Sequence, residues 1–548
     1  MFCYINRKNI YIISLILILF SALLVRLYGV NFGLPFIYIS DEKTFVSLAL
    51  KILRTCDLNP HWFGHPGTTI FYMLALLYIF IFLVGLITGN FINSSDFEQI
   101  YYQDPTIFYL SGRLLFVLFA ILTIFFVYLI ASRLFNKFTG LISASLLAFN
   151  SIHVFFSKLI RTDIFMTFLI LMVFGFCLKI LKNRKVKNYI LAGCILGLAV
   201  ATKYPAVICG VFIIIAWLCT KVWRDIFKVL ISGIFCLLGA FVSSPFLFLD
   251  FKNMLVDVKG EASCLHISGT GGGCIDNLIW YIKEPLYDSF FLIGLILVVL
   301  GVIFCFFYYS KKEKWLLLVF PFCFLFFITS LSLRWAHWIM PIIPFMCIFA
   351  GYGLNCIINL FKQRWTFRLN NLLIFFLIFF TLLPLIKTSI LQGYEMLRKD
   401  TRTLAREWVL ENIPKGSRLL IEKYTPHLPT NDYKFFVVNS YEEGYEGSLG
   451  ELIQLDLSDI KYAVFDPIYT QAGNLKNIQG IYDNKINYII LSNWYERYLK
   501  EKDRYKSYSD IVDMYEQLMS IGNKIYEIKP VNKNNGPIIR IYRLKDKE

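Results

Sequence analysis

The chain has 548 residues, of which 57% are hydrophobic and 18% aromatic, and its formal net charge is +16. This composition is too apolar for an ordinary soluble enzyme. The positive charge does not indicate nucleic-acid binding, because the tail from Gln392 onward holds 23 basic and 23 acidic residues and the whole surplus lies between apolar segments.

Eleven of these apolar segments are predicted to cross a bilayer. With the N-terminus in the cytoplasm, the basic loops at 133–137, 182–187, 221–228, 311–314 and 362–368 all fall on the inner side. The segments are 9–30, 108–132, 139–157, 163–182, 189–203, 205–220, 229–249, 287–309, 315–333, 339–361 and 371–391. The sequence therefore predicts a polytopic α-helical membrane protein, with about 11–13 transmembrane helices, in the plasma membrane of a prokaryote.

The first outer loop, 31–107, contains a segment that does not fit this count. Residues 67–89 are long and apolar enough to span, but a single crossing there would invert the side of every later basic loop. We therefore expect 67–89 to be re-entrant, to lie at the interface or to return as a hairpin.

Residues 1–391 form the predicted membrane domain, and 392–548 form a separate extra-membrane unit outside the cell. Asp400 is predicted to cap a helix that ends near Asn412, before Pro414-Lys415-Gly416. A helix is also expected at 510–519. Short β-branched and aromatic runs predict strands at 418–422, 435–438, 462–465, 488–491 and 538–542. The tail is therefore predicted to be a soluble α/β domain.

The acidic pair Asp41-Glu42 is the strongest candidate site, because two carboxylates beside a bilayer need compensation by water, a cation or a substrate. The alternative is that they cap the amphipathic helix expected at 44–54. We favour a functional role, since two acids exceed what a cap needs.

Further ionisable residues are predicted at the same outer face: Lys43, His61, His65, Lys158, Arg161, Asp163, Lys203, His266, Arg334 and His337. Their gathering resembles a site for a charged substrate with a lipid tail. Arg161 and Asp163 can equally form a structural ion pair, and Lys203 can extend to the interface.

Several of these features also have structural interpretations. Arg113 is expected to anchor its helix at the membrane surface. The histidines His61, His65 and His337 are expected to be structural, and metal-ligand spacing is absent. No cofactor is predicted beyond a lipid-linked donor, although a divalent metal stays open. A disulfide between Cys264 and Cys274 is a further open alternative.

Seven short motifs, taken in order, resemble the GT-C membrane glycosyltransferases, specifically the protein O-mannosyltransferase and aminoarabinose-transferase branch. They are Ser40-Asp41-Glu42, His65-Pro66, Arg113-Leu114-Leu115, Arg161-Thr162-Asp163, the run 197–204, the run 334–344 and the run 400–408. The resemblance covers nearly the whole membrane part. It implies a polyprenyl-phosphate sugar as donor and a hydroxyl group of a protein, lipid or glycan as acceptor.

The resemblance also implies roles for individual residues. Asp41 takes the proton of the acceptor hydroxyl in a single inverting displacement, with Glu42 beside it in the site. Arg161, Lys203 and Arg334 are the candidates to hold the leaving phosphate, and Asp163 orients a basic residue or the acceptor. The chain departs from the family at His65-Pro66-Gly67, where members often carry a second proline and a lysine. Lys43 is a candidate replacement for that lysine, and His65, His337 and Arg113 complete the predicted substrate-binding set.

Two other classes compete with this interpretation. A transporter or flippase of lipid-linked sugars also needs charges at membrane depth, but it should show paired half-sequences and charges near the midplane. This sequence shows no internal repeat, and its charges avoid the centres of the spans. A non-catalytic scaffold leaves Asp41-Glu42 unexplained.

Overall fold

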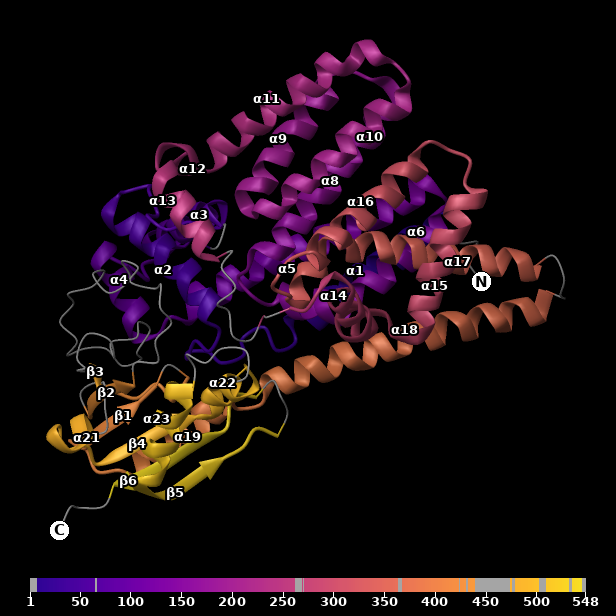
Figure 1. Ribbon diagram of the computed structural model, residues 1–548. Helices are drawn as coiled ribbons and strands as arrows, with labels where there is room; N and C mark the ends of the chain where they lie inside the picture. Colours follow the sequence, from indigo (N-terminus) through magenta and orange to yellow (C-terminus); the bar gives the residue numbers. More distant parts are fainter. Residues whose placement is uncertain are drawn as a thin grey trace.

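The fold is known from a computed structural model, in which a helical bundle carries a small sheet domain at its C-terminal end (Figure 1). The structure describes residues 7–64, 67–261, 269, 271–362, 367–422, 424–429, 432–438, 474–475, 479–501, 509–531 and 535–544. Among these residues, eight helices are long and apolar enough to cross a membrane, or nine if the bent pair α6 and α7 is one span.

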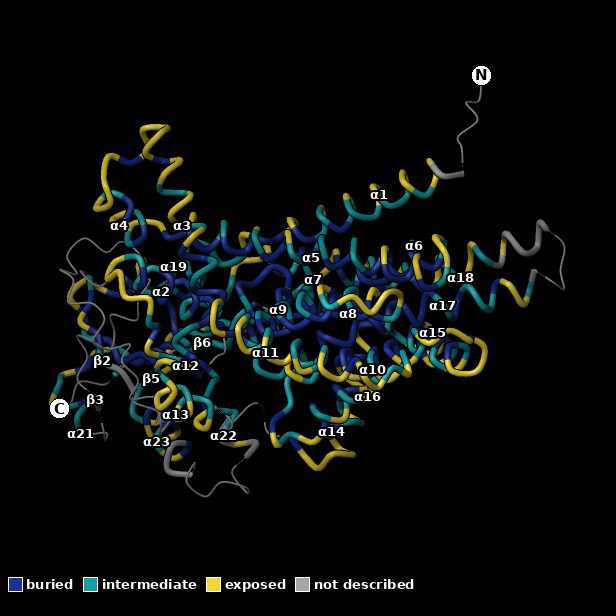
Figure 2. Tube along the Cα trace, turned by 90° about the horizontal axis from the view of Figure 1, so that it is seen from above, coloured by how far each residue is buried: buried dark blue, intermediate teal, exposed yellow. Residues whose placement is uncertain are grey.

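The predicted spans coincide with helices or bent helix pairs of the bundle. These are α1 (Arg7–Leu27), α5 (Thr106–Leu134), α6 (Lys137–Ala148) with α7 (Ser151–Ser157), α8 (Thr162–Asn183), α9 (Val186–Thr202), the 3₁₀ helix η1 (Tyr204–Cys209) with α10 (Gly210–Thr220), η2 (Trp223–Asp225) with α11 (Ile226–Ser243), α15 (Tyr287–Tyr308), α16 (Glu313–Thr329), η4 (Ala336–Ile342) with α17 (Ile343–Lys362), and α18 (Phe367–Leu397). Figure 2 shows buried segments in the middle of the bundle around α7 and α8. The predicted polytopic helical fold is confirmed.

The two ends of the bundle differ in charge, as the positive-inside pattern requires. The basic loops gather at the end where α1 begins: Lys137 Nζ lies 5.5 Å from the centre of the Tyr11 ring, and Lys228 Nζ donates to Arg184 O at 3.0 Å. At the other end Gly29, just after α1, packs against Gly393 in the last turns of α18, which leads into the sheet domain. Which compartment each end faces stays a prediction. We call the end beside the sheet domain the outer end.

Helix α9 approaches α11 closely, and this contact fixes where Lys203 emerges. A Cβ atom on Gly193 would lie 2.2 Å from Ser232 O, and one on Gly197 would lie 2.1 Å from Cys236 O. Small residues allow such backbone contact between membrane helices. The chain leaves α9 at Lys203, and Pro205 then starts η1.

The segment predicted to be interfacial forms one continuous helix, α3 (Thr68–Thr88). Its first turn contacts the outer end of α9, because Thr69 Oγ1 donates to Thr202 Oγ1 at 2.9 Å. Its middle contacts the outer end of α5, because the Tyr78 hydroxyl donates to Phe108 O at 3.3 Å. Helix α3 therefore runs along the outer end rather than through the bundle, which fits the interfacial alternative.

Short helices complete the outer end of the membrane domain. They are α2 (Ser40–Thr55), α4 (Ser94–Gln103), α12 (Phe246–Leu249), α13 (Phe251–Glu261), α14 (Cys274–Tyr281) and the π-helical turn η3 (Ile282–Leu286).

Asp57, after α2, accepts a hydrogen bond from His61 Nε2 at 2.8 Å, and this bond lowers the pKa of Asp57. Cys274 is a free thiol, whereas Cys264 lies outside the described residues.

The sheet domain is a mixed α/β unit, as predicted. Its strand order is β3-β2-β1-β4-β6-β5, with β1 to β4 parallel and β6 antiparallel to β4 and β5. Its elements are α19 (Thr401–Asn412), β1 (Arg418–Ile421), β2 (Lys434–Val438), β3 (Asn474–Leu475), α21 (Gln479–Asp483), β4 (Tyr488–Ser492), η6 (Asn493–Tyr495), α22 (Glu496–Glu501), α23 (Ser509–Ser520), β5 (Gly522–Ile528) and β6 (Ile539–Leu544). Four predicted strands and both helices are confirmed, and the run at 462–465 lies outside the described residues. The edge strand β5 was not predicted, because its outward face is polar.

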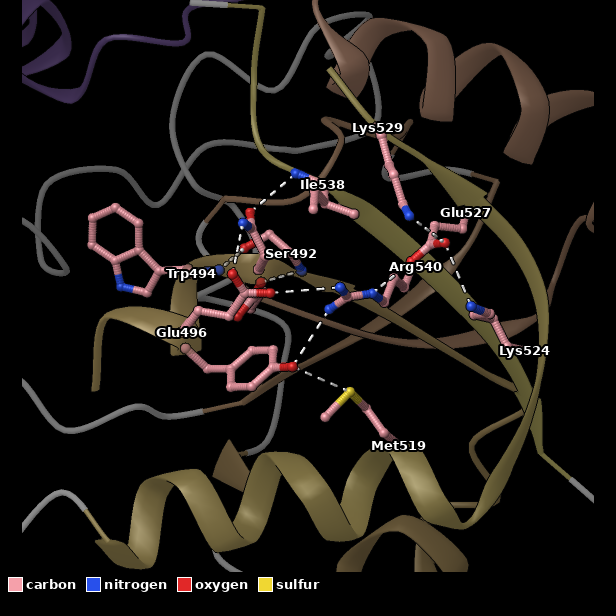
Figure 3. A network of polar contacts seen from close by, with 12 residues as sticks. Ser492, Trp494, Glu496, Met519, Lys524, Glu527, Lys529, Ile538 and Arg540 are labelled. Atoms are coloured by element: carbon pink, nitrogen blue, oxygen red, sulfur yellow. Dashed lines mark hydrogen bonds and ion pairs between the residues drawn. The ribbon is translucent and has the colours of Figure 1, made fainter. Parts of the chain in front are cut away.

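Alternating side chains of the central strands build a core on each side of the sheet. Leu419 and Ile421 pack with Val409 of α19, whereas Leu420 packs with Tyr515 of α23. Figure 3 shows an ion network beyond these cores, in which Arg540 Nε donates to Glu527 at 2.8 Å and Nη2 lies 3.5 Å from Glu496. Because this network is partly exposed, it ties strand edges together at small energetic gain.

Candidate functional site

The outer end of the bundle brings together most of the predicted site residues. Asp41 and Glu42 lie in the first turn of α2, which begins after Ile39 without any side-chain cap. The capping interpretation of these two acids therefore has no hydrogen bond to support it. Arg161 and Asp163 lie on either side of the first residue of α8, and Lys203 follows the last residue of α9.

Glu42 is held in a buried ion pair with Arg113 of α5. Arg113 Nε donates to Glu42 Oε1 at 2.9 Å and Nη2 donates to Oε2 at 2.7 Å, and the side chains are 1% and 0% exposed. Glu42 Oε1 also accepts the Ile160 N–H at 3.0 Å. The remaining nitrogen, Arg113 Nη1, donates to Val30 O and Phe32 O, both at 2.8 Å. Every polar atom of the pair is satisfied, as a buried ion pair requires.

This arrangement corrects one prediction and reassigns another residue. Arg113 does not extend to the membrane surface, because it reaches inward to neutralise Glu42 and to satisfy two carbonyl groups. Glu42 is predicted as catalytic, but its geometry favours a structural role. It fastens the start of α2 to α5 and to the turn before α8.

Asp41 belongs to a different cluster, which we call the outer ionic network: Asp41, Arg161, Asp163, Lys203 and His337. Arg161 Nη2 lies 3.1 Å from Asp41 Oδ2, and Arg161 Nε lies 3.6 Å from Asp163 Oδ2. Lys203 Nζ donates to Asp163 Oδ1 at 2.6 Å. Two carboxylates thus face two cations, so the network is neutral before any substrate binds.

His337 enters this network from η4. Its Nε2 lies 3.2 Å from Arg161 Nη2, and a guanidinium can only donate, so Nε2 accepts and the proton is assigned to Nδ1. His337 and Asp41 thus both contact Nη2 of Arg161.

The members of the network differ in how far they reach solvent. The Asp163 side chain is 1% exposed and Lys203 is 13% exposed, whereas Asp41 is 25% exposed. Within the described part of the chain, Arg161 is the cation that lies within ion-pair distance of Asp41. Asp41 is thus the accessible carboxylate of the site, and Asp163 orients the two cations.

Arg334 lies three residues before His337 in the sequence. Its backbone N–H donates to Gly269 O at 2.7 Å, and its guanidinium carbon lies 5.1 Å from the centre of the Trp280 ring. Among the described residues, no carboxylate lies within ion-pair distance of it. An anion at this place would complete its charge.

The remaining predicted residues are placed as follows. Lys43 lies partly exposed in the first turn of α2. His65 lies outside the described residues, and His61 is paired with Asp57 away from the network. No cluster of three or more metal-binding side chains occurs in the described ranges.

Sequence reasoning missed one buried cation at this end, Arg26, and it named Lys158 at the outer face without predicting its burial. Arg26 of α1 donates to Ala148 O at 2.8 Å and lies 2.8 Å from His153 Nδ1, and Lys158 donates to Tyr28 O at 2.7 Å. Both cations meet carbonyl groups at the ends of helices, where the helix dipole favours positive charge. A charge inside the first apolar span was the available signal for Arg26.

Comparisons with known proteins agree with this architecture. Residues 109–248 match the family model described as dolichyl-phosphate-mannose-protein mannosyltransferase. ArnT from Cupriavidus metallidurans bound to undecaprenyl phosphate has a similar structure, with a TM-score of 0.53, 11% identity, and 98% of each chain covered. The chain has no match among curated protein sequences.

A second similar structure is the archaeal oligosaccharyltransferase AglB from Archaeoglobus fulgidus, in complex with an inhibitory peptide and a dolichol-phosphate. The TM-score is 0.51 at 12% identity, with 90% of this chain and 71% of that chain covered. At such identities the likeness establishes the fold. The predicted resemblance to GT-C membrane glycosyltransferases is therefore confirmed.

Proposed function

We propose that the protein is an inverting glycosyltransferase that moves a sugar from a polyprenyl-phosphate donor to a hydroxyl acceptor at the outer face of the membrane. The observation that carries this proposal is the contrast between two adjacent acids. Glu42 is buried with Arg113, whereas Asp41 is paired with Arg161 but stays partly exposed to solvent. A general base needs a carboxylate that its substrate can reach.

The proposed reaction is a single displacement at the anomeric carbon. The acceptor oxygen forms the new bond to this carbon while its proton passes to a carboxylate oxygen of Asp41. The bond between the anomeric carbon and the phosphate oxygen breaks, and the electron pair leaves with the lipid phosphate. Arg161 holds a carboxylate oxygen of Asp41 in place for this proton transfer, because its Nη2 lies 3.1 Å from Asp41 Oδ2.

Arg334 is the proposed partner of the donor phosphate. The positive charges of Lys203 and Arg161 are already balanced by Asp163 and Asp41. A phosphate placed beside them would therefore add an unbalanced negative charge. Arg334 has no such acid among the described residues, and it can form the paired hydrogen bonds that arginine makes with phosphates. The polyprenyl phosphates in the two similar structures support this class of donor.

The test is a donor screen with the purified full-length protein in detergent. Polyprenyl-phosphate mannose, glucose and aminoarabinose are each supplied with hydroxyl acceptors, and products are identified by mass spectrometry. We expect one donor to be consumed with inversion, and Asp41→Asn to stop this without unfolding the protein. Asp57→Asn is the matched control, because Asp57 is an exposed acid of the same loop whose ionic partner is His61. Full activity of Asp41→Asn would remove Asp41 from the mechanism.

The competing transporter interpretation predicts a different result in vesicles. The lipid-linked sugar would then cross the bilayer intact, and no glycosidic bond would break. The outer ionic network argues against this interpretation, because its charges gather at one end of the bundle rather than along a path through it.

A further inference from the structure

The sheet domain touches the membrane domain just before Asp41. The Tyr38 hydroxyl lies 2.5 Å from Thr403 Oγ1 of α19. The guanidinium carbon of Arg402 lies 3.9 Å from the centre of the Tyr38 ring, and Arg402 Nη1 donates to Tyr38 O at 3.5 Å. Tyr38 is thus held by its ring, its hydroxyl and its carbonyl. We call Tyr38, Arg402 and Thr403 the Tyr38 clamp.

Arg402 is itself fixed, so the clamp is not a loose surface contact. Its Nε and Nη2 donate to the two oxygens of Asp400, each at 2.8 Å, and both side chains are 12% exposed. Asp400 also caps α19 by accepting the Arg402 N–H at 2.8 Å. A bidentate pair sets the plane of a guanidinium, and here it lays Arg402 over the Tyr38 ring.

The clamp is also tied to the core of the sheet domain. Thr401 Oγ1 donates to Pro537 O at 2.6 Å, and its N–H donates to Asn535 O at 2.9 Å, just before β6. Gly536 has a φ of 94°, and a Cβ atom there would lie 2.3 Å from Thr401 Oγ1 and 2.5 Å from Asp400 Oδ1. This glycine lets the β6 loop close over the start of α19. The position of Arg402 therefore follows that of the sheet.

A second contact holds the same segment. Arg406 lies one turn further along α19, and its guanidinium carbon is 5.2 Å from the centre of the Phe36 ring. Its Nη1 donates to His427 O at 2.6 Å. Phe36 in turn lies against Tyr38, with ring centres 6.2 Å apart. Residues 36–38 are thus held by contacts with the sheet domain, and Glu42 is held by its ion pair with Arg113 of α5. Asp41 lies between these two attachments.

We propose that Arg402 is a positioning residue for Asp41, so that the sheet domain is part of the active site. This inference rests on the proposed function. The Glu42–Arg113 pair fixes one side of Asp41, and the Tyr38 clamp fixes the other. Releasing the clamp lets the backbone before Asp41 move, and a displacement of about 1 Å can cost about a hundredfold in rate. Among the described residues Arg402 contacts Asp400 and Tyr38 rather than the outer ionic network, so it acts through Tyr38.

The test compares Arg402→Ala, Arg402→Lys and the control Lys399→Ala in the full-length protein. Lys399 lies on the same segment but forms an exposed pair with Glu407, so its removal should change nothing. We expect Arg402→Ala to lower kcat about 10- to 100-fold with little change in the donor KM. Arg402→Lys should recover part of this loss, because an ammonium can still lie over the Tyr38 ring although it cannot pair bidentately with Asp400.

Hydrogen exchange separates positioning from a general loss of structure. In Arg402→Ala the amides of residues 39–45 should exchange faster, while those of β1 and β4 stay as slow as in the wild type. Unchanged exchange at 39–45, or faster exchange there with an unchanged kcat, would overturn the inference. If no donor is turned over by the wild type, the proposed function fails, whereas the exchange data still decide whether the clamp holds the segment.

Discussion

Asp41 and Glu42 are neighbours in the sequence, but they lie in opposite environments. Glu42 points into the bundle, where Arg113 and the Ile160 N–H surround it. Asp41 points into the outer ionic network and keeps solvent access. Consecutive residues of a helix point roughly 100° apart, so the first turn of α2 sends one acid to the core and the other to the site. The comparison shows that two adjacent acids in one helical turn can have different roles, with Glu42 stabilising the fold and Asp41 available for chemistry.

Exchanging each acid for its amide is the strongest way to break this comparison. Asp41→Asn removes the proposed base, and we expect kcat to fall by about 10² to 10⁴, the usual contribution of general-base catalysis. The thermal unfolding temperature should stay near that of the wild type, because Asp41 is partly exposed. The measurement is initial rate beside thermal unfolding in detergent. An Asp41→Asn protein that unfolds early would mean that Asp41 is structural as well.

The Glu42–Arg113 pair should show the reverse behaviour. Arg113→Met leaves a buried carboxylate without its cation, and breaking such a pair costs about 3–5 kcal/mol. We expect little folded protein from this variant, measured by size exclusion and thermal unfolding. The double variant Glu42→Leu with Arg113→Met should recover part of the loss, because no unpaired charge stays buried. It should not recover all, since Val30 O and Phe32 O lose their donor. Equal instability of the single and double variants would contradict this account.

The architecture was predictable from the sequence because its signals are local. Hydropathy and the basic loops placed the spans, and Asp400 followed by a periodic helix and Pro414 placed α19. The roles of Asp41 and Glu42 were not predictable, because the direction of each side chain depends on α5 and on the turn before α8. In the Tyr38 clamp, Arg402 contacts Tyr38, a residue 364 positions earlier in the sequence. No pattern within a window of sequence carries such a contact.

Arg334 extends the comparison to the cations of the site. Unlike Arg161, it has no acid in the described part of the chain, so its charge should serve the donor phosphate. We expect Arg334→Ala to raise the donor KM about tenfold, since a hydrogen bond to a charged group contributes about 1.5–3 kcal/mol. Arg334→Lys should recover part of the affinity. Arg398→Ala, at an exposed arginine near the end of α18, is the control. An unchanged KM in Arg334→Ala would move the phosphate to another cation.

Glu422 is another buried acid, and it tests whether a buried carboxylate needs a cation such as the arginine that pairs with Glu42. Glu422 follows β1 and accepts hydrogen bonds from the Ser492 N–H and, at 2.6 Å, from the Tyr515 hydroxyl. No cation pairs with it among the described residues, and burial raises its pKa. The folded domain therefore holds this proton at pH values where the unfolded chain has released it. Its contribution to stability is complete below the unfolded pKa and is lost as the pH rises through the folded pKa.

The smallest expected effect is a difference in how steeply the stability of the sheet domain changes with pH. Between pH 4.5 and 7, the stability of the wild-type sheet domain should fall more steeply with rising pH than that of Glu422→Gln, which cannot ionise. Exchange of the Leu420 and Ile489 amides, corrected for the intrinsic rate, reports this in the full-length chain. Glu527 titrates in the opposite sense, because its hydrogen bond from Arg540 lowers its pKa, but it is common to both proteins and cancels in the difference. Parallel slopes would mean that Glu422 stays ionised when buried, and hydrogen bonds alone would then suffice to hold a carboxylate that Glu42 holds with an arginine.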